Sequence, residues 1–458
     1  MIVPFSEDFI PIAHVLTESR PGNSMVCARE NGMLVWSDFT RLITRLTGAL
    51  SSEPAESIIV ACADPSNFLA ALLALWQCGH TPVVPSNYRP ETVKQLTARG
   101  CRGINDTDVI NLADQHPPAR LGRLDPAACR LVLYTSGSSG EPKMVNKTVS
   151  QLDAELAIHE RQWGEAASGC GVLATVPHHH IYGLLFRLLW PFAAGRPFDC
   201  CTCANPVQLG ERITRFTDHI LVSSPSHLTR FPQLMELGDW KPVPRMLFSS
   251  GGPLPAETAA IYRRHFGHTP VEIFGSTETG GVAWRRRQGD ADEDAWTPLP
   301  GVQVRRDADN ALLLDSLFLS QPNWRMDDAV SLLDDGRFRL EGRLDRIVKL
   351  EGKRLALPEM ERRLEVHPWV ASAAVVLLGN VSRLGAVVVP TPAGQSALNT
   401  YGRRRTVQAL RDYLKDAFEP MLLPRRFRFV TQLPVSDRGK VTRHELNALF
   451  ESPNESDA

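Results

Sequence analysis

The chain contains the stretch Leu131-Val-Leu-Tyr-Thr135-Ser136-Gly137-Ser138-Ser139-Gly140-Glu141-Pro142-Lys143, in which an apolar run of strand length leads into a loop of hydroxyl residues and glycines. Glycines let the backbone curl, so several N–H groups can point into one concavity, and the hydroxyls add donors at its rim. Such a loop suits a polyphosphate. It has neither the Walker A spacing nor the G-x-S-x-G spacing of a nucleophile elbow. Taken alone, a flexible Ser/Gly surface turn stays open as the alternative.

Apolar runs of strand length alternate with helical patterns through the first three quarters of the chain. We expect strands near residues 57–62, 81–85, 131–134, 171–177, 219–223 and 245–248, and helices near 37–50, 67–77, 151–162 and 256–264. This alternation is typical of a parallel or mixed α/β sheet that helices cover on both faces. Ligands of such sheets bind at loops past the carboxyl ends of strands.

The pattern changes after Ala283. A charged loop at residues 285–294 precedes shorter β-like runs at 302–305, 311–319 and 337–340. From about Leu344 we expect a separate small α+β unit, with helices near 358–366 and 406–418 and strands near 371–378 and 385–389. The predicted domains are therefore residues 1–343 and 344–458.

The composition excludes several classes of protein. With 458 residues, 43% of them apolar and 22% charged, the chain has a globular composition and length for roughly two to four domains. A net charge of −1 gives no bulk attraction to nucleic acid or anionic lipid. The longest apolar stretches, near 68–76 and 181–190, are too short to span a bilayer. We expect a cytoplasmic protein with no nucleic-acid partner and no membrane insertion.

The nine cysteines are scattered along the chain, which does not predict a disulfide framework. Cys200 and Cys203 form one C-x-x-C spacing, but no second Cys or His pair at ligand spacing lies nearby. We therefore interpret this group as small buried residues in a strand and not as a metal or redox site.

Further segments complete a recognisable order of motifs. They are Pro177-His-His-His180-Ile-Tyr182-Gly183, Ser249-Ser-Gly251-Gly252-Pro-Leu254, Phe274-Gly275-Ser276-Thr277-Glu278, Trp324-Arg-Met-Asp327-Asp328, Gly342-Arg343-Leu-Asp345, Lys349-Leu-Glu-Gly-Lys-Arg354 and Pro434-Val-Ser-Asp-Arg-Gly439-Lys440-Val-Thr-Arg443. With the loop at 131–143, this order resembles the adenylate-forming (AMP-binding) superfamily, which includes acyl- and aryl-CoA synthetases, peptide-synthetase adenylation domains and luciferases. The resemblance covers nearly the whole chain. It implies a large N-terminal domain of two layered α/β subdomains plus a small β-barrel-like part, followed by a smaller, mobile α+β C-terminal domain.

The resemblance implies that the protein uses ATP and Mg²⁺ to activate a fatty or aryl carboxylic acid as acyl-AMP, with release of pyrophosphate. Glu278 is the expected Mg²⁺ ligand, since Mg²⁺ prefers oxygen and bridges phosphates. Thr277 would bond the α-phosphate, and Asp328 would accept hydrogen bonds from the ribose hydroxyls. The full set expected to bind ATP is Thr135, Ser136, Gly137, Ser138, Ser139, Gly140, Lys143, Gly251, Gly252, Phe274, Gly275, Ser276, Thr277, Asp328 and Arg343.

Lys440 is the expected electrostatic catalyst, because its ammonium could reach the oxygens on which charge shifts during the reaction. The catalytic set that the resemblance implies is Lys440, Thr277, Glu278 and His180. A solvated turn lysine is the alternative for Lys440.

The resemblance places the acyl pocket around His180, Gly183, Leu184, Ser223, Gly251 and Gly275. The apolar residues Leu184, Leu185 and Phe186 favour a fatty or aryl acid. His180 would pack and gate this pocket. We interpret His178 and His179 as ordinary loop histidines, because consecutive strand residues point to opposite faces and cannot easily ligate one ion.

Asp345 is the implied hinge about which the C-terminal domain turns to present either Lys440 or the loop at 350–354. The thiol acceptor would be coenzyme A or the phosphopantetheine of an acyl carrier protein. Residues 344–458 carry 18 Lys+Arg and 13 Asp+Glu, against 32 and 38 in the remainder. A basic face formed by Arg403, Arg404, Arg405, Arg411, Lys415, Arg425, Arg426 and Arg428 would suit an acidic carrier protein. This charge and the short length favour the carrier protein slightly, with coenzyme A close behind.

Two residues depart from the family pattern. Met144 replaces a frequent Gly and could crowd the loop exit, and Asp327 replaces a Gly, which suggests a residue with φ above zero. The alternatives to an acid–thiol ligase are a carrier-protein-binding module of the same fold that has lost adenylation, and a nucleotide phosphohydrolase or kinase that uses the Ser/Gly loop.

Overall fold

The computed structural model describes residues 8–18, 20–51, 54–98, 100–136, 142–289, 294–350, 353–378, 383–434 and 443–451. The described residues form two compact units, of which the first comprises those up to 136, 142–304 and 314–324, and the second comprises 305–313 and those from 325 on. The predicted boundary between residues 343 and 344 stays a prediction. The prediction of a mixed α/β protein with a smaller C-terminal domain is confirmed.

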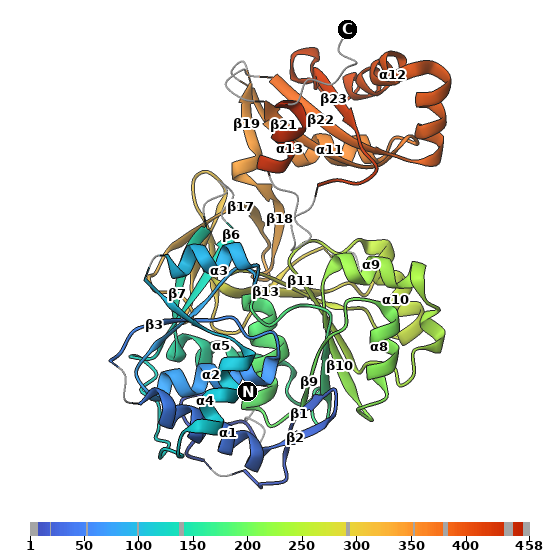
Figure 1. The fold of residues 1–458 in the computed structure, drawn as a ribbon. Coiled ribbons are helices and arrows are strands. Elements are labelled where there is room, and N and C mark those ends of the chain that lie inside the picture. The colour runs from blue at the N-terminus through green and yellow to red at the C-terminus, as the bar shows by residue number, and fades with distance from the viewer. Residues whose placement is uncertain are drawn as a thin grey trace. The chain divides into compact units, whose positions relative to one another are not determined.

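A five-stranded sheet of order β5-β3-β4-β6-β7 forms one half of the first unit. Its strands are β3 (Ser57–Val60), β4 (Thr81–Val84), β5 (Arg102–Ile104), β6 (Arg130–Ser136) and β7 (Pro142–Thr148), and only β7 runs antiparallel to its neighbour. Helices α1 (Trp36–Leu50), α2 (Pro65–Gln77) and α4 (Asp106–Gln115) lie side by side against it (Figure 1). Helix α3 (Pro90–Thr97) packs Leu96 against Ile59 and Val83.

Local sequence explains why α2 forms where it does. Asp64 precedes the helix and accepts hydrogen bonds from the N–H groups of Ser66 and Asn67, and Pro65 occupies the first turn, where no N–H is needed. Every residue from Pro65 to Trp76 is buried. An apolar helix enclosed on all sides belongs in the interior, as its Ala/Leu-rich sequence predicts.

A nine-stranded sheet of order β14-β13-β12-β11-β10-β8-β9-β1-β2 forms the other half of the first unit. Its strands are β1 (Met25–Arg29), β2 (Gly32–Val35), β8 (Gly171–Ala174), β9 (Phe198–Thr202), β10 (His219–Ser223), β11 (Met246–Ser250), β12 (Val271–Ser276), β13 (Gly280–Arg286) and β14 (Thr297–Pro298). The run β9-β8-β10-β11-β12 is parallel throughout. The loops after β8, β10, β11 and β12 therefore leave the sheet at one edge, and these loops carry the predicted site motifs.

Helices cover both faces of this sheet. Helices α8 (Pro206–Ile213), α9 (Pro225–Leu234) and α10 (Ala256–Phe266) line one face (Figure 1), where Leu209, Leu228 and Tyr262 join one apolar cluster with Leu221 and Leu247. On the other face, α5 (Val149–Trp163) and the π-helix at Leu184–Leu189 bring aromatic side chains onto Phe248.

The second unit holds most of a four-stranded sheet and a small α+β part. The sheet has the order β15-β16-β17-β18 and lies in the segment where a β-barrel-like part was predicted. Its strands are β15 (Gln303–Arg306), β16 (Ala311–Asp315), β17 (Trp324–Leu332) and β18 (Phe338–Arg343). The short hairpin of β19 (Ile347–Leu350) and β20 (Lys353–Ala356) follows it.

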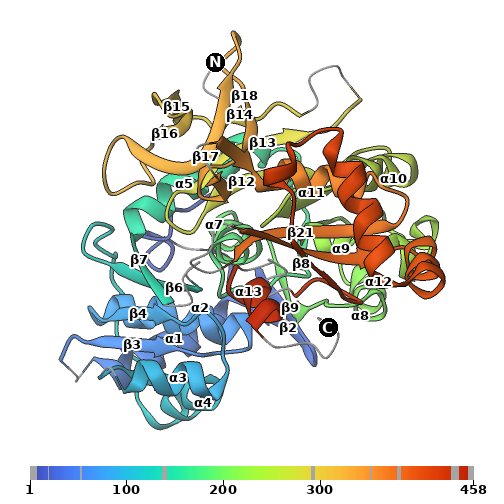
Figure 2. The ribbon, with the colours of Figure 1, turned by 90° about the horizontal axis from the view of Figure 1, so that it is seen from above.

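The α+β part is built on the sheet β21 (Val370–Leu378), β22 (Arg383–Pro390) and β23 (Arg426–Phe429). Helices α11 (Leu357–Glu365) and α12 (Pro392–Lys415) cover one face, and α13 (Arg443–Glu451) packs Leu446 and Phe450 on the other (Figure 2). The helix expected at 406–418 corresponds to the part of α12 that follows Gly402 and ends at Lys415. The non-helical backbone of Gly402, with a φ of 75° and a ψ of 162°, separates it from a preceding helical segment that begins at Pro392 and was not predicted. Among the described residues, no helix is both long and apolar enough to cross a bilayer.

Candidate active site

The described ends of the predicted phosphate loop form a β-hairpin. Strands β6 and β7 pair in register from Arg130 opposite Thr148 to Ser136 opposite Pro142. Thr135 and Lys143 are direct partners, and the Thr135 hydroxyl donates to the carbonyl of Lys143 at 3.4 Å. Gly137, Ser138, Ser139 and Gly140 lie outside the described residues. The hairpin thus holds Thr135 and Lys143 together at the base of the loop.

Lys143 contacts the predicted Mg²⁺ ligand. Its Nζ donates to Oε1 of Glu278 at 2.8 Å, and the side chains are 58% and 22% exposed. Burial by itself would raise the pKa of Glu278, but the hydrogen bond and charge of Lys143 hold that pKa below its ordinary value of 4.5. The carboxylate is therefore ionised at neutral pH, and its side chain is partly exposed.

Glu278 lies in a tight turn that follows β12. The N–H of Ser276 donates to Oγ1 of Thr279 at 3.0 Å, and the N–H of Thr279 donates back to Oγ of Ser276 at 3.2 Å. Gly275 is required at the entry to this turn, because a Cβ there would collide with the carbonyl oxygen of Gly280. The Phe-Gly-Ser-Thr-Glu sequence thus sets the path of the backbone as well as supplying polar side chains.

The glycine loop after β11 lies beside this turn, since β11 and β12 are neighbouring strands. Gly251 has a φ of 96°, a backbone conformation that favours glycine, and Gly252 is exposed. The Ser250 hydroxyl donates to the carbonyl of Ile273 at 2.8 Å. The Phe274 ring is half-buried, with its centroid 5.6 Å from that of Trp296.

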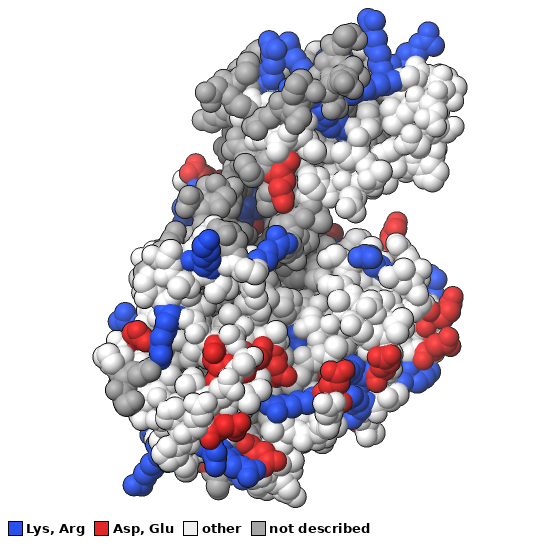
Figure 3. Space-filling view, viewed as in Figure 1, with Lys and Arg blue, Asp and Glu red and all other residues white. Residues whose placement is uncertain are grey.

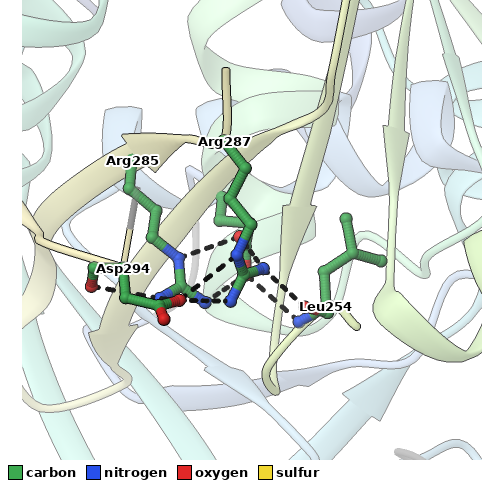
Figure 4. Close-up of polar contacts among 5 residues, drawn as sticks. Leu254, Arg285, Arg287 and Asp294 are labelled. Atoms are coloured by element: carbon green, nitrogen blue, oxygen red, sulfur yellow. Dashed lines mark hydrogen bonds and ion pairs between the residues drawn. The ribbon is translucent and has the colours of Figure 1, made fainter. Parts of the chain in front are cut away.

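Leu254, at the end of the glycine loop, is held by a buried ion cluster (Figure 4). Its N–H donates to Oε2 of Glu272 at 3.1 Å, and its carbonyl accepts from Nη1 of Arg287 at 2.6 Å. Arg285 binds the same Glu272 carboxylate through two hydrogen bonds of 2.9 Å, and Asp294 bridges the two arginines. The N–H of Leu254 is thereby fixed to β12, and its carbonyl to Arg287, which directly follows β13.

The predicted acyl-pocket residues come from four segments of the first unit: residues 180–184, the end of β10, the loop after β11, and β12. Ser223 ends β10, and its hydroxyl lies 2.8 Å from the hydroxyl of Thr175. Gly183 packs so closely on Pro177 that a Cβ would collide with the Pro177 carbonyl oxygen. Leu184 is fully buried at the start of the π-helix, and His180 is half-buried immediately before the helical segment.

His178 lies in the loop after β8, as the interpretation of it as a loop histidine expects, but it is packed into the interior. Its ring is buried, with Nε2 3.0 Å from the carbonyl of Cys62 and 3.3 Å from the hydroxyl of Tyr88. The ring also packs on Phe68, and the neighbouring His179 ring lies 4.5 Å from Tyr88. These contacts join the loop after β8 to the five-stranded half of the unit.

The predicted ribose-binding residues lie together in the second unit. Asp328 and Arg343 are direct partners in the β17–β18 hairpin, and Nη1 of Arg343 lies 3.8 Å from Oδ2 of Asp328. The suggestion that Asp327 has a φ above zero is wrong, because Asp327 lies within the extended strand β17. Its carboxylate lies 3.7 Å from Arg343 and 4.0 Å from Arg325.

Two further predicted residues, Lys440 and Asp345, belong to the mechanism in which the C-terminal domain moves. Lys440 lies outside the described residues. Asp345 lies in a 3-10 turn at Leu344–Arg346, between β18 and β19, which is a short junction of the kind a hinge requires. Their roles stay predictions.

Comparisons with known proteins agree with the motifs. A profile described as AMP-binding enzyme matches residues 104–311, and a profile described as AMP-binding enzyme C-terminal domain matches residues 359–440. A 4-coumarate–CoA ligase of Rhodobacter capsulatus is 30% identical over 310 residues, which span 68% of this chain and 74% of that protein. The chain belongs to the AMP-binding enzyme family. An anthranilate–CoA ligase of Pseudomonas aeruginosa is 25% identical over 78% of this chain and 75% of its own length.

Solved structures of similar fold cover almost the whole chain. The ATP-bound crystal structure of MatB from Rhodopseudomonas palustris has a TM-score of 0.81 at 18% identity, covering 97% of this chain and 99% of that one. A benzoate CoA ligase from Burkholderia xenovorans has a TM-score of 0.74 at 21% identity, covering 96% and 100%. The predicted enzyme class, an AMP-forming acid–thiol ligase of the adenylate-forming superfamily, is confirmed with the family.

Two buried charged residues beside the site were missed by the sequence analysis. Lys147 on β7 and Glu155 on α5 lie beneath the turn that carries Glu278. Burial lowers the pKa of Lys147, although the charges of Glu155 and Glu278 oppose this shift, and burial raises the pKa of Glu155 to about 7. The sequence of this AMP-binding enzyme held one sign that Lys147 is buried. In a strand over residues 143–148 side chains alternate between the two faces, so Lys147 lies on the same face as the apolar Val145.

The basic face predicted for the C-terminal domain is smaller in the structure. Arg428 is buried and donates to the carbonyl of Leu449, so counting it in that face is wrong. Arg403 donates to the carbonyl of Phe427, and Arg426 stacks over Phe450. The side chains that stay exposed are Arg404, Arg405, Lys415 and Arg425.

Proposed function

We propose that this enzyme activates an aryl carboxylic acid with ATP as an acyl-AMP and then transfers the acyl group to the thiol of coenzyme A. The observation that carries the proposal is the Lys143–Glu278 pair, which sets a cation and an ionised carboxylate side by side at the base of the hydroxyl/glycine loop. A protein that binds a triphosphate needs a cationic side chain to pair with the phosphate oxygens. It also needs a carboxylate that binds the same Mg²⁺ ion as the phosphates do. The relatives named for 4-coumarate and anthranilate support this reaction.

Glu278 would hold Mg²⁺, and the residues present fit that ion. Mg²⁺ is usually bound through one or two carboxylates together with nucleotide phosphates and water, and not by a cage of protein ligands. Across the part of the chain that the structure describes, no group of three His, Cys, Asp or Glu side chains could hold a metal. A single ionised, partly exposed Glu278 matches the first arrangement. When bound, the ion would offset the charge that develops on the phosphates.

The remaining predicted roles are retained in this proposal. Thr135, Thr277 and Lys143 would bind phosphate oxygens, Phe274 would offer its face to adenine, and Asp328 with Arg343 would bind the ribose. Lys440 would stabilise the charge that passes between the carboxylate and the α-phosphate, and His180 would gate the acyl pocket.

An aryl acid fits the described pocket residues better than a long fatty acid. Phe186 is buried two positions after Leu184, and the rings of Trp163, Trp190 and Phe248 lie around it with centroids 5.8, 6.0 and 5.0 Å away. We take this packed aromatic group as the floor of the acyl pocket, and a closed floor admits a compact ring more easily than a long chain.

A carrier protein is the second candidate acceptor. Lys and Arg side chains gather at the end of the second unit where α12 lies (Figure 3), and Arg404 and Arg405 on this helix are exposed. An acidic carrier protein could dock there through charge attraction. Because Arg428 and Arg403 are engaged within the domain, we place coenzyme A first.

The experiment is a panel of acids with each acceptor. Benzoate, 4-coumarate, anthranilate, malonate and octanoate are each offered with ATP, Mg²⁺ and either coenzyme A or a phosphopantetheinylated carrier protein, and mass spectrometry measures AMP and thioester. We expect AMP and coenzyme A thioester with an aryl acid. Release of ADP, or no AMP with any acid, would overturn the proposal, and thioester on the carrier protein alone would favour the second acceptor.

A further inference from the structure

Lys147 is a buried lysine that points to the back of the proposed Mg²⁺ site. It is 3% exposed, and its Nζ donates to the main-chain carbonyl of Glu278 at 2.8 Å and to that of Phe318 at 2.9 Å. Residues 143 and 147 lie on the same side of β7, since side chains of a strand alternate. One strand therefore supplies two lysines to one glutamate: Lys143 binds its carboxylate and Lys147 binds its carbonyl.

Glu155 holds the other end of the same turn. Its side chain is 2% exposed, and Oε1 accepts the N–H of Gly281 at 2.6 Å. The backbone comes so close that a Cβ on Gly280 would collide with Oε2 of Glu155, and Gly280 has a φ of 69°. The turn at residues 276–281 is thus fixed from inside the protein at one carbonyl and one N–H.

Stability alone is a poor explanation for this arrangement. Burying charges costs free energy, and a buried ion pair is often no more stabilising than apolar residues of the same volume. Lys147 and Glu155 both form hydrogen bonds with the main chain of the same turn. That turn carries Glu278, which is partly exposed and pairs with Lys143 of the phosphate loop. Residues behind a metal ligand commonly set its orientation, and changing them costs roughly 10–100-fold in metal affinity.

We propose that Lys147 and Glu155 are positioning residues that fix the 276–281 turn and thereby aim the Glu278 carboxylate at Mg²⁺ and the phosphates of ATP. This inference rests on the proposed function, because it assumes that Glu278 binds the ion. It assigns no direct contact with substrate to either residue.

The test measures ATP binding by calorimetry with Mg²⁺ and with EDTA, without any acid, so it does not depend on acyl transfer. The main variant is Lys147→Met/Glu155→Gln, which removes both buried charges together, while the amide oxygen of the introduced glutamine keeps an acceptor for the N–H of Gly281. We expect its gain in ATP affinity on adding Mg²⁺ to fall about tenfold, with affinity in EDTA unchanged. Amides of residues 276–281 should also exchange hydrogen faster than in the wild type.

Two further variants separate positioning from general loss of structure. Glu155→Gln alone should keep most of the Mg²⁺-dependent gain, because Lys147 still binds the Glu278 carbonyl. Arg196→Met removes a buried cation that pairs with Glu160 elsewhere in the unit; it should lower the melting temperature and leave the gain unchanged.

The inference is overturned if the double variant keeps the wild-type gain, or if it loses ATP affinity equally with Mg²⁺ and EDTA. A wild-type protein that shows no gain on adding Mg²⁺ would instead remove the proposed role of Glu278. Failure of acid activation in the panel above, with a normal Mg²⁺-dependent gain, would reject the proposed reaction and leave the positioning role intact.

Discussion

Lys143 and Glu278 are 135 positions apart in the chain, yet Nζ of the lysine lies 2.8 Å from Oε1 of the glutamate. The lysine comes from the five-stranded sheet, and the glutamate follows a strand of the nine-stranded sheet. The pair therefore joins the two α/β halves of the first unit at the base of the phosphate loop. A partly exposed ion pair adds little to stability, and in the proposed function its charges serve the ligand.

Replacing Lys143 should weaken the use of ATP more than it weakens the fold. We expect Lys143→Met to lower kcat/KM for ATP by roughly 10²-fold, as loss of a preorganised donor does, and to change the free energy of unfolding by less than about 1 kcal/mol. Initial rates of AMP formation and thermal melts measure the two effects. Lys94→Met, an exposed lysine on α3, is the control, and an unchanged ATP dependence for Lys143→Met would contradict its role.

The ion cluster at Leu254 predicts an effect on nucleotide binding from a residue outside the pocket. Arg287→Met removes the donor to the Leu254 carbonyl but leaves Glu272 paired with Arg285, so the protein should still fold. The loosened loop should raise KM for ATP by about 3–10-fold with little change in KM for the acid. Arg286→Met, at the adjacent position that ends β13, should leave both KM values as they are. Equal effects of the two variants would show that the cluster does not act on the loop.

Glu155 predicts a pH dependence of stability. Burial raises its pKa in the folded protein to about 7 from 4.5, so between these values the folded state keeps a proton that the unfolded state has lost. Stability should therefore fall as the pH rises from 4.5 to 7, by roughly 1–3 kcal/mol from this group. Denaturant unfolding of the wild type and Glu155→Gln across this range measures it. The difference between the two proteins should change in the same window, and parallel curves would contradict the prediction.

Lys440 and the hinge predict that the two half-reactions can be separated. Lys440→Ala should lose acyl-AMP formation by roughly 10²–10³-fold, while preformed acyl-AMP still reacts with coenzyme A. Rapid-quench measurements of each half-reaction test this. Equal loss in both would contradict a mechanism in which the domain presents Lys440 only for the first step.

Much of the fold could be predicted because each element has a strong local signal. The strand at 219–223 has an apolar centre, Ile-Leu-Val, and the helix at 67–77 is rich in Ala and Leu. The structure places β10 at His219–Ser223 and α2 at Pro65–Gln77. Strand β7 was not predicted, since Pro142-Lys-Met-Val-Asn-Lys-Thr has few apolar residues and depends on pairing with β6. Pairing with a neighbouring strand determines whether such a segment becomes a strand, and the local sequence pattern carries no information about that pairing.

The residues of the candidate site also fall into two groups: those predicted from local motifs, and those whose contacts depend on tertiary packing. Thr135, Lys143 and Glu278 were predicted from their motifs, and the structure brings Lys143 and Glu278 into contact. Lys147 and Glu155 were not predicted, because the hydrogen bonds that place them go to main-chain groups of distant segments. Glu272 was not predicted either, because its partners, the N–H of Leu254 and two arginine side chains, reach it only through strand pairing. Burial of His178 depends on Cys62, Phe68 and Tyr88, which are brought to it only by the packing of the two sheets.

Exchange of labelled pyrophosphate into ATP tests acid adenylation without any thiol acceptor. We expect exchange that requires both Mg²⁺ and an aryl acid, that is absent without the acid, and that falls roughly 10²-fold or more in Lys143→Met. Exchange with none of the acids in the panel, or exchange that does not depend on an acid, would contradict the assignment of this protein as an aryl-acid-activating ligase.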